Sequence, residues 1–330
     1  MGVDLPLLDF SKFLHGNPTE RLEVAEQIAD CFTRHGFIKL KNHGVSDDIV
    51  QDIWKWGKLF FNMTTEQKMK IIHHPGPDPQ RGWSQKGAET TSKLRKENAD
   101  GAPRGELLDE KEHFDCGPPG DEQFPNIYPE DDLPGYKEFV ENYFTAAQQA
   151  CLEIMSACEV GLHIPEGTLL NSCIPAASEL RMLHYPAVSI ETLEKGLIKR
   201  AWPHTDFGII TLLFQDALGG LELEDRSDPF HFVPVITESS NEMVVNISDT
   251  FNRWSNGTIK AGLHQVNVPP VMRGSTQGSV PDRYSSVFFF KAHREASVGP
   301  LKEFVNSERP AQYSDINALE FHREMTDILY

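Results

Sequence analysis

The chain has few of the features that mark secreted, membrane-spanning or nucleic-acid-binding proteins. Its five cysteines are odd in number and show no C-x-x-C spacing, so we expect reduced thiols in a cytoplasmic protein. No apolar run is long enough for a signal peptide or a transmembrane helix, which predicts no membrane anchor. The 31 basic residues are outnumbered by 49 acidic ones, and the net charge of −18 argues against nucleic acid and anionic membranes as partners.

The first part of the chain contains three helix starts and one short strand. Asn17, Ser46 and Thr64 are each followed by residues typical of a capped helix, so three helices are predicted. Residues 37–41, between the first two helices, are predicted to form a strand. The helix that begins after Ser46 is expected to turn Leu59 toward the core.

A long polar segment separates these helices from the rest of the chain. Residues 73–133 are rich in proline, glycine and charge, which is typical of a functional or mobile excursion. Within it, Lys93–Arg104 has almost no large apolar residue and is predicted to be mobile and to order, at least partly, when substrate binds. A solvated surface loop that never touches substrate is the alternative. Residues 136–161 then show apolar side chains at helical spacing, which predicts a long helix that backs a sheet.

Short strand patterns dominate the chain after this helix. They lie at 179–184, 208–214, 220–224, 230–235, 242–247, 263–267 and 284–290, with turn residues between them. This pattern predicts an α+β fold with a double-stranded β-helix (jelly-roll) core, flanking helices and an N-terminal helical region that backs the sheet. A last helix is predicted at 315–330.

Three residues among these strands have side chains that bind divalent metals. His204 and Asp206 are two apart, so in an extended strand both side chains point to the same side. His264, on a later strand pattern, can complete the set. Two imidazoles and one carboxylate are the ligands of a non-haem Fe(II) site with three open positions. A lone His-x-Asp is common at polar strand ends, but the ordered set predicts a metal site.

A second pair of polar residues opens the last strand pattern. Arg283 and Ser285 are again two apart, and an apolar run at 287–290 follows them. A guanidinium beside a hydroxyl suits the far carboxylate of a 2-oxo acid. A surface salt bridge is the competing interpretation, but a single arginine at the start of an apolar strand favours a buried carboxylate partner.

Five further segments follow the pattern of a known family: Pro6–Phe10, Gly36–Val45, Arg81–Trp83, Lys111–Asp115 and Leu180–Ala187. With the metal motif, they make nearly the whole chain resemble the isopenicillin N synthase-like 2-oxoglutarate- and Fe(II)-dependent dioxygenases, nearest to microbial thymine-hydroxylase-like members. The resemblance implies one dioxygenase domain over residues 1–330. Its N-terminal region would span 1–135, and the backing helix, jelly roll and C-terminal helix would span 136–330.

The resemblance also implies the cofactors and the roles of the site residues. Fe(II) would be held by the three predicted ligands, and O2 and 2-oxoglutarate would react there. The distal carboxylate of 2-oxoglutarate would meet Arg283 and Ser285, and Tyr185, just before a proline, would add a hydroxyl donor. The implied activity is oxidation of a small molecule with release of succinate and CO2.

Two positions depart from the family's pattern. Gln265 stands where the family usually has arginine after the distal histidine. The interval between His264 and Arg283 is longer than usual, and residues 271–282 are expected to form an extended hairpin tip. Neither departure removes a ligand, and both concern the rim of the site.

Aromatic residues near the metal motif predict an apolar pocket. Trp202 and Phe207, with Phe214 or Phe290, are expected to form its walls, and the 73–133 segment and the C-terminal helix are candidate lids. Such a pocket suits an apolar or heteroaromatic small molecule, for example a natural-product intermediate of secondary metabolism. Hydroxylation, desaturation and ring rearrangement all stay open as outcomes, as does the oligomeric state.

Three other functions are compatible with parts of the pattern. One is an Fe(II) oxidase of the same fold that needs no 2-oxoglutarate, and another is a non-catalytic jelly-roll protein that binds a small molecule. The third is a zinc hydrolase, because Zn(II) also accepts two histidines and a carboxylate. A complete ligand set argues against the binding protein, and Arg283, Ser285 and Tyr185 have no evident role in the hydrolase.

Overall fold

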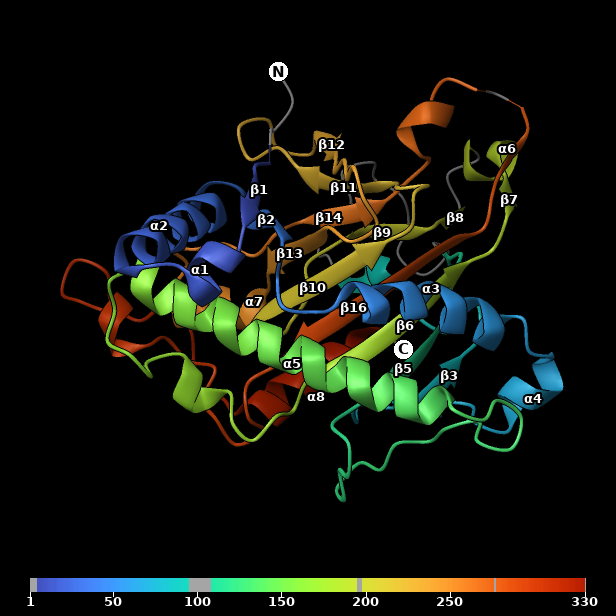
Figure 1. Cartoon of the computed structure of the whole chain (residues 1–330), viewed down its shortest axis with the longest axis horizontal. Helices are drawn as coiled ribbons and strands as arrows, with labels where there is room; N and C mark the ends of the chain where they lie inside the picture. Colours follow the sequence, from blue (N-terminus) through green and yellow to red (C-terminus); the bar gives the residue numbers. More distant parts are fainter. Residues whose placement is uncertain (1–4, 95–107, 195–197, 276, 330) are drawn as a thin grey trace.

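Two β-sheets form the core of the molecule, and helices cover one side of the larger sheet (Figure 1). The structure is a computed structural model that describes residues 5–94, 108–194, 198–275 and 277–329. It confirms the α+β class and the double-stranded β-helix predicted from the strand pattern. Within the described residues, no helix has both the length and the apolar character needed to cross a membrane.

Among the described residues, the larger sheet has eight strands. In spatial order they are β1 (Leu7–Asp9), β2 (Phe37–Lys41), β13 (Met243–Ile247), β10 (Ile210–Gln215), β16 (Arg283–Phe290), β6 (Glu179–Tyr185), β5 (Glu112–Cys116) and β3 (Gly82–Ser84). The β1–β2 pair is parallel and the other neighbouring pairs are antiparallel. N-terminal strands therefore flank the C-terminal strands at both edges of the sheet.

The smaller sheet has four strands and shares an apolar core with the larger one. Its strands, in spatial order, are β12 (Phe232–Pro234), β11 (Leu221–Glu224), β14 (His264–Val266) and β9 (Ala201–His204). Two further pairs are β7 (Val188–Ser189) with β15 (Ser279–Val280), and β4 (Leu108–Asp109) with β8 (Ile198–Lys199). The register of β9 and β14 places His204 opposite His264.

Long helices pack on the outer face of the larger sheet, as predicted (Figure 1). They are α2 (Pro18–His35), α3 (Asp47–Phe61) and α5 (Tyr136–Gly161). The other helices are α1 (Ser11–His15), α4 (Thr65–Met69), α6 (Ile190–Glu194), α7 (Asp249–Trp254), α8 (Ala318–Leu329) and the 3-10 turns η1 (Thr91–Leu94), η2 (Leu170–Ser172), η3 (Pro270–Met272) and η4 (Lys302–Phe304). The prediction for Leu59 is wrong: it is 45% exposed, because Ile53 and Phe60 form the buried side of α3.

The predicted helix starts are confirmed by their hydrogen bonds. The Asn17 side chain accepts from the Glu20 backbone amide, and the Glu20 carboxylate accepts from the Asn17 amide. Thr64 and Gln67 form the same reciprocal pair at α4, and Ser46 caps α3 with one bond. Each cap satisfies amides that the helix leaves unpaired and contributes about 1 kcal/mol.

Residues of β16 alternate between two buried environments. Phe288 and Phe290 lie in the core beneath α5, where Phe214 also packs. Val287 and Phe289 point the other way and line a cavity between the sheets. The prediction that Phe214 or Phe290 forms a pocket wall is therefore wrong, since both side chains lie on the helix side of the sheet.

Two segments that looked irregular contain regular structure. Residues 73–133 include β3, η1, β4 and β5, so this excursion adds strands to the core. The 271–282 segment is not a free hairpin tip, because β15 within it pairs with β7. The segment Lys93–Arg104, predicted to order when substrate binds, lies mostly outside the described residues.

Candidate metal centre and substrate cavity

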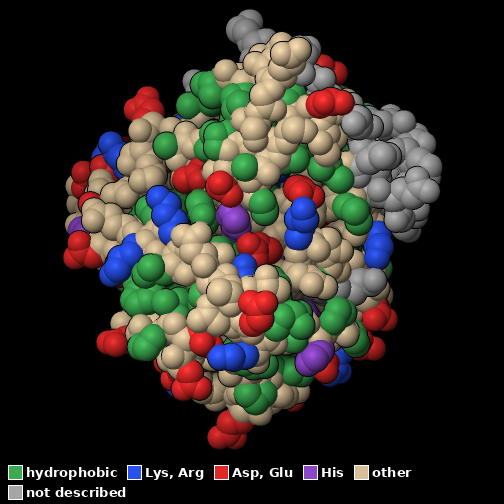
Figure 2. Space-filling model, turned by 90° about the vertical axis from the view of Figure 1, so that its right-hand side faces the viewer, with side chains coloured by type: hydrophobic (Ala, Val, Ile, Leu, Met, Phe, Trp, Pro, Cys, Tyr) green, Lys and Arg blue, Asp and Glu red, His purple; other side chains and the backbone are tan. Residues whose placement is uncertain are grey.

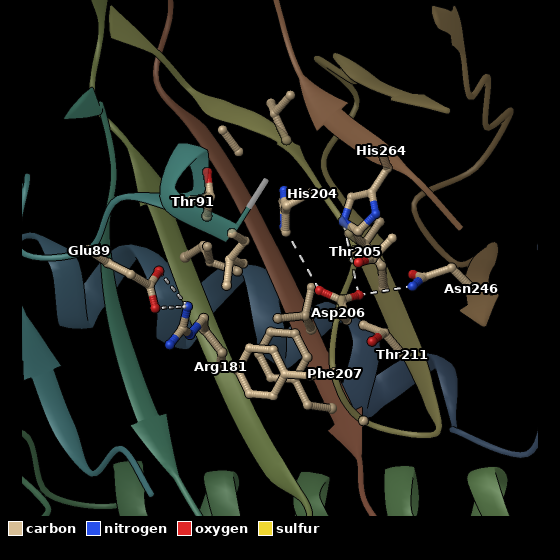
Figure 3. Close-up of a pocket in the computed structure, with 18 of the residues that line it drawn as sticks. Glu89, Thr91, Arg181, His204, Thr205, Asp206, Phe207, Thr211, Asn246 and His264 are labelled. Atoms are coloured by element: carbon tan, nitrogen blue, oxygen red, sulfur yellow. Dashed lines mark hydrogen bonds and ion pairs between the residues drawn. The ribbon is translucent and has the colours of Figure 1, made fainter. Parts of the chain in front are cut away.

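The three predicted metal ligands meet at one side of the cavity between the sheets (Figure 3). His204 and His264 come from neighbouring strands of the smaller sheet, and Asp206 follows β9. Strand β9 ends at His204, so Asp206 lies in the turn after the strand and not within it. Nevertheless, one ligand atom from each residue lies within 4.8 Å of the others.

Hydrogen bonds hold the two imidazoles with the same ring nitrogen facing inward. The Nδ1 atom of His204 lies 2.7 Å from the Trp202 carbonyl oxygen, and Nδ1 of His264 lies 3.0 Å from the Gly262 carbonyl oxygen. A carbonyl oxygen only accepts, so each Nδ1 carries a proton, and the lone pair of the neutral ring is then on Nε2, which faces the other ligands. The Nε2 atoms lie 3.9 and 4.0 Å from the Asp206 carboxylate oxygens.

The charges at this cluster suit a divalent cation. Burial, together with the neighbouring His264, lowers the pKa of His204 to about 3. Burial raises the pKa of Asp206, but the two histidines and the Asn246 amide outweigh it, and the pKa stays below its ordinary value. At neutral pH the His204 imidazole is therefore neutral and the Asp206 carboxylate is ionised, as metal ligation requires.

Asn246 and Asp249 hold the turn that carries Asp206, and sequence reasoning missed both. The Asn246 amide donates to Asp206 Oδ2 at 2.9 Å, and the Asp249 backbone amide donates to the Asp206 carbonyl oxygen at 2.7 Å. Gly208 closes the turn, because an added Cβ there would lie 2.6 Å from the Phe290 carbonyl oxygen. These contacts come from strands and helices remote in sequence, so no local pattern marks them.

The predicted co-substrate residues also come together. Arg283 is completely buried, and its Nη1 donates to Ser285 Oγ at 2.9 Å. Its Nε donates to the Gly219 carbonyl oxygen at 2.7 Å, and its guanidinium carbon lies 4.8 Å from the centre of the Tyr185 ring. Tyr185 lines the cavity. A buried guanidinium with a hydroxyl and an aromatic ring beside it is suited to a carboxylate.

The opposite side of the cavity carries a buried ionic network, which we call the ionic wall: Glu89, Asp109, Lys111, Asp115 and Arg181. Arg181 donates through Nη1 to both Glu89 oxygens at 2.9 and 3.0 Å and through Nε to Asp115 at 2.7 Å. Lys111 Nζ lies 3.0 Å from Glu89 and 2.9 Å from Asp109. Although burial opposes ionisation, Arg181 and Lys111 hold the pKa of Glu89 well below its ordinary value.

Sequence reasoning underestimated Arg181, although a usable signal was present. Arg181, Leu183 and Tyr185 alternate along β6, so all three face the same side of the strand. All three line the cavity, together with Glu89 and Lys111 from the N-terminal excursion. A charged residue on the same face as the predicted co-substrate tyrosine could therefore have been assigned to the site.

Other residues named from the sequence have different positions. Phe207 lines the cavity as predicted, whereas Trp202 packs between segments, with its backbone amide bonded to Thr91 and its indole bonded to the Leu108 carbonyl. His184 bridges Glu112 and Asp282 and is not a ligand.

On the face shown in Figure 2, acidic and basic side chains are interspersed, so the charge of −18 does not form one continuous field there.

Two family models match the chain. Residues 5–134 match the model described as non-haem dioxygenase in morphine synthesis N-terminal, and residues 177–292 match the 2OG-Fe(II) oxygenase superfamily. A curated relative from Aspergillus flavus, the 2-oxoglutarate-dependent dioxygenase imqE, is 46% identical over 99% of this chain and 94% of its own length. This chain belongs to the 2OG-Fe(II) oxygenase superfamily. It is an Fe(II)- and 2-oxoglutarate-dependent dioxygenase, with O2 as the oxidant.

Two further similarities bear on this oxygenase. Proline hydroxylase buaE of Petromyces alliaceus is 37% identical, with 95% of each chain covered. A full-length protein of Neurospora crassa, solved in complex with alpha-KG, superposes with a TM-score of 0.84 at 33% identity, over 98% of this chain and 96% of that one. The same Neurospora protein in complex with alpha-KG and thymine gives a TM-score of 0.85 at 32% identity, over 98% and 96% of the two chains. The likeness therefore extends over nearly the whole fold.

Proposed function

We propose that His204, Asp206 and His264 are the Fe(II) ligands of this oxygenase. The observation that carries the proposal is the convergence of the three side chains, with both imidazole Nε2 atoms about 4 Å from one carboxylate. The donor set fits the metal, because two neutral imidazoles and one carboxylate leave positions open for other ligands. When bound, the iron supplies the oxidative chemistry that couples decarboxylation of 2-oxoglutarate to oxidation of a substrate C–H bond.

We propose that Arg283, Ser285 and Tyr185 bind and orient 2-oxoglutarate. Arg283 forms no ion pair with another described residue, so its charge is available to the distal carboxylate. The cavity that Tyr185 and the three metal ligands line is also lined by apolar residues, among them Leu183, Leu213, Leu221, Val266 and Val287. They would contact the methylene groups of the co-substrate and exclude water from it.

The substrate is proposed to be a small molecule with an apolar or heteroaromatic body and at least one polar group. Phe207, Phe289 and Leu329 offer apolar contact, while Glu89 and Arg181 of the ionic wall offer hydrogen-bonding groups across the cavity (Figure 3). The solved Neurospora complexes contain thymine and 5-formyluracil, and one relative is named a proline hydroxylase. Small polar rings, including natural-product intermediates, are therefore the first class to test.

Residues 1–330 are proposed to act as one catalytic domain. Support comes from the cavity, which is lined by Glu89, Thr91 and Lys111 of the N-terminal region and by strands of the C-terminal region. Neither region alone would enclose the substrate.

We further propose a cytoplasmic location without nucleic-acid or membrane partners, supported by five buried, unpaired cysteines and the acidic composition.

Anaerobic titration with Fe(II) and then 2-oxoglutarate tests the metal and co-substrate assignments. The expected result is a weak visible charge-transfer band that saturates in the wild type and is absent in Asp206→Ala. Arg283→Ala should bind 2-oxoglutarate two to three decades more weakly, because loss of one partner of a buried ion pair costs about 3–5 kcal/mol. A change below threefold in Arg283→Ala would contradict its assignment.

Coupled product analysis tests the reaction itself. Candidate heterocycles and cyclic amino acids are screened for release of succinate in proportion to oxidised product. Product without succinate would identify an oxidase that uses no 2-oxoglutarate. A purified protein that binds a candidate ring but forms no product with Fe(II), O2 and 2-oxoglutarate would contradict catalysis on that substrate.

A further inference from the structure

A second arginine lies buried beside the proposed co-substrate site with most of its donors unused. Arg200 immediately precedes β9 and is 1% exposed. Its Nη2 donates to the Pro281 carbonyl oxygen, but its Nε and Nη1 have no hydrogen-bond partner among the described residues. Buried polar atoms are nearly always paired, and an unpaired buried guanidinium is especially costly. We therefore expect a hydrogen-bond acceptor to bind to the Nε and Nη1 atoms of Arg200.

Arg200 and Arg283 lie against the same aromatic ring. The guanidinium carbon of Arg200 is 6.0 Å from the centre of the Tyr185 ring, and that of Arg283 is 4.8 Å from it. Burial and the charge of Arg283 lower the pKa of Arg200 to about 10, so the Arg200 side chain remains cationic at neutral pH. Two cations in one buried region repel each other unless an anion lies between them.

The acidic residues of this region do not supply that anion. The Asp282 carboxylate accepts hydrogen bonds from Ala187 and lies 2.8 Å from His184, and it is 52% exposed. The Asp216 carboxylate accepts from the Tyr284 and Leu218 backbone amides. Neither forms an ion pair with Arg200 or Arg283 within the described residues.

We propose that Arg200 is a second guanidinium of the distal-carboxylate subsite and shares the 2-oxoglutarate carboxylate with Arg283. The inference rests on the proposed function, because it requires the carboxylate to lie at Arg283 and Tyr185. Arg200 reaches this subsite from the smaller sheet and Arg283 from the larger one, so a bound dicarboxylate would link the two sheets. The consequence is selectivity: 2-oxo acids that lack the distal carboxylate gain nothing from either arginine.

The competing explanation is a structural role, in which Arg200 only clamps the turn at Pro281. That role uses Nη2 and leaves the other donors buried without partners. The two explanations differ in what they predict for ligand selectivity. A clamp affects every 2-oxo acid equally, whereas a carboxylate partner affects only those that carry the second carboxylate.

Calorimetric binding under anaerobic conditions separates these explanations. The Fe(II)-loaded wild type, Arg200→Met, Arg200→Lys and Arg283→Met are each titrated with 2-oxoglutarate and with 2-oxopentanoate, which has the same length but no distal carboxylate. We expect Arg200→Met to weaken 2-oxoglutarate binding by about 10- to 100-fold, the effect of losing a charge-assisted hydrogen bond, and 2-oxopentanoate binding by less than threefold. Arg200→Lys should recover part of the loss.

Arg226→Met provides a matched control for loss of a largely buried arginine. Arg226 bonds to the backbone carbonyls of Thr33, Lys260 and Ala261, so its replacement should lower Tm without changing the preference between the two acids. The proposal is overturned if Arg200→Met weakens both acids equally or neither. If Arg283→Met also leaves 2-oxoglutarate binding unchanged, the co-substrate assignment itself fails, which is a different result from failure of Arg200 alone.

Discussion

The two sides of the cavity use charge in opposite ways. At the metal side, the Asp206 carboxylate faces two histidines, of which His204 is neutral, and it forms no ion pair with a lysine or arginine among the described residues. At the ionic wall, Glu89 meets both Arg181 and Lys111, and each of these cations meets a further carboxylate. The metal side therefore has a carboxylate without a lysine or arginine partner, which suits a metal cation, whereas every carboxylate of the wall lies against at least one cation of the protein.

The difference in charge pairing suggests different roles for the two sides: the metal side is suited to exchange ligands, and the ionic wall is suited to hold its shape. A cluster that lacks its counter-charge can change its ligands without breaking a protein contact, which suits a metal that exchanges co-substrate and product. A buried network with every charge paired is costly to disturb, because removal of one member leaves the others uncompensated. We therefore expect substitutions at the metal side to affect activity most, and substitutions at the wall to affect stability most.

The largest expected effect is on turnover at the metal side. Asp206→Ala and His264→Ala should each reduce succinate formation by at least about a thousandfold, because the proposed Fe(II) site loses a ligand. The circular dichroism spectrum and Tm of metal-free Asp206→Ala should stay close to those of the metal-free wild type, since Asp206 lies in the turn after β9. Wild-type turnover in either variant would contradict the assignment of the ligands. Loss of the folded spectrum would show that the metal side also contributes strongly to stability, as the ionic wall is expected to do.

The next effect is on stability at the wall. Arg181→Met should lower the free energy of unfolding by about 3–5 kcal/mol, because Glu89 and Asp115 are left buried with less compensation. Urea denaturation measures this difference. Arg34→Met is the matched control, since its pair with Asp30 is more than half exposed and should contribute little. Equal unfolding free energies for Arg181→Met and wild type would show that the wall is not a stabilising network.

A smaller and local effect is expected where the C-terminal helix covers the wall. Leu329 lines the cavity, and its carbonyl oxygen accepts a 3.3 Å hydrogen bond from the Thr90 amide next to η1. Leu329→Ala should weaken this contact by about 2 kcal/mol, so the Thr90 amide should exchange more than tenfold faster. Ile328→Ala, at a neighbour that is 43% exposed, should leave exchange unchanged. Equal exchange in both variants would contradict a covering role for α8.

The smallest effect concerns the pH dependence of stability at His322. His322 is buried beside Lys291, and burial followed by the Lys291 charge lowers the pKa of His322 to about 3. The folded pKa is depressed below the unfolded value of about 6.5, so the unfolded chain binds the extra proton and stability falls as pH drops below 6.5. His322→Gln should reduce this fall by about 1.4 kcal/mol per pH unit between pH 6 and 5. Parallel stability curves for variant and wild type would contradict a neutral His322.

Local patterns were sufficient for many strands and for the helix caps, but not for β3, β4 and β5 within the 73–133 segment. His204 with Asp206, and Arg283 with Ser285, are each two residues apart, and their side chains carry the relevant chemistry themselves. Asn17 and Thr64 likewise specify helix starts through bonds to residues three positions away. The helix caps depend on neighbours within a few residues and are confirmed. The roles of the two spaced pairs in metal and co-substrate binding stay predictions.

The tertiary structure alone decided which face of a strand meets the cavity and which charges meet each other. Strand β16 is buried on both faces, so apolar character could not distinguish Phe289 in the cavity from Phe290 beneath α5. Glu89 and Arg181 are 92 positions apart, and their pairing depends on how β6 and the N-terminal excursion pack. The position of Arg200 could not be predicted from its neighbours in sequence either, because it lies beside Tyr185 and Arg283 only in the folded chain.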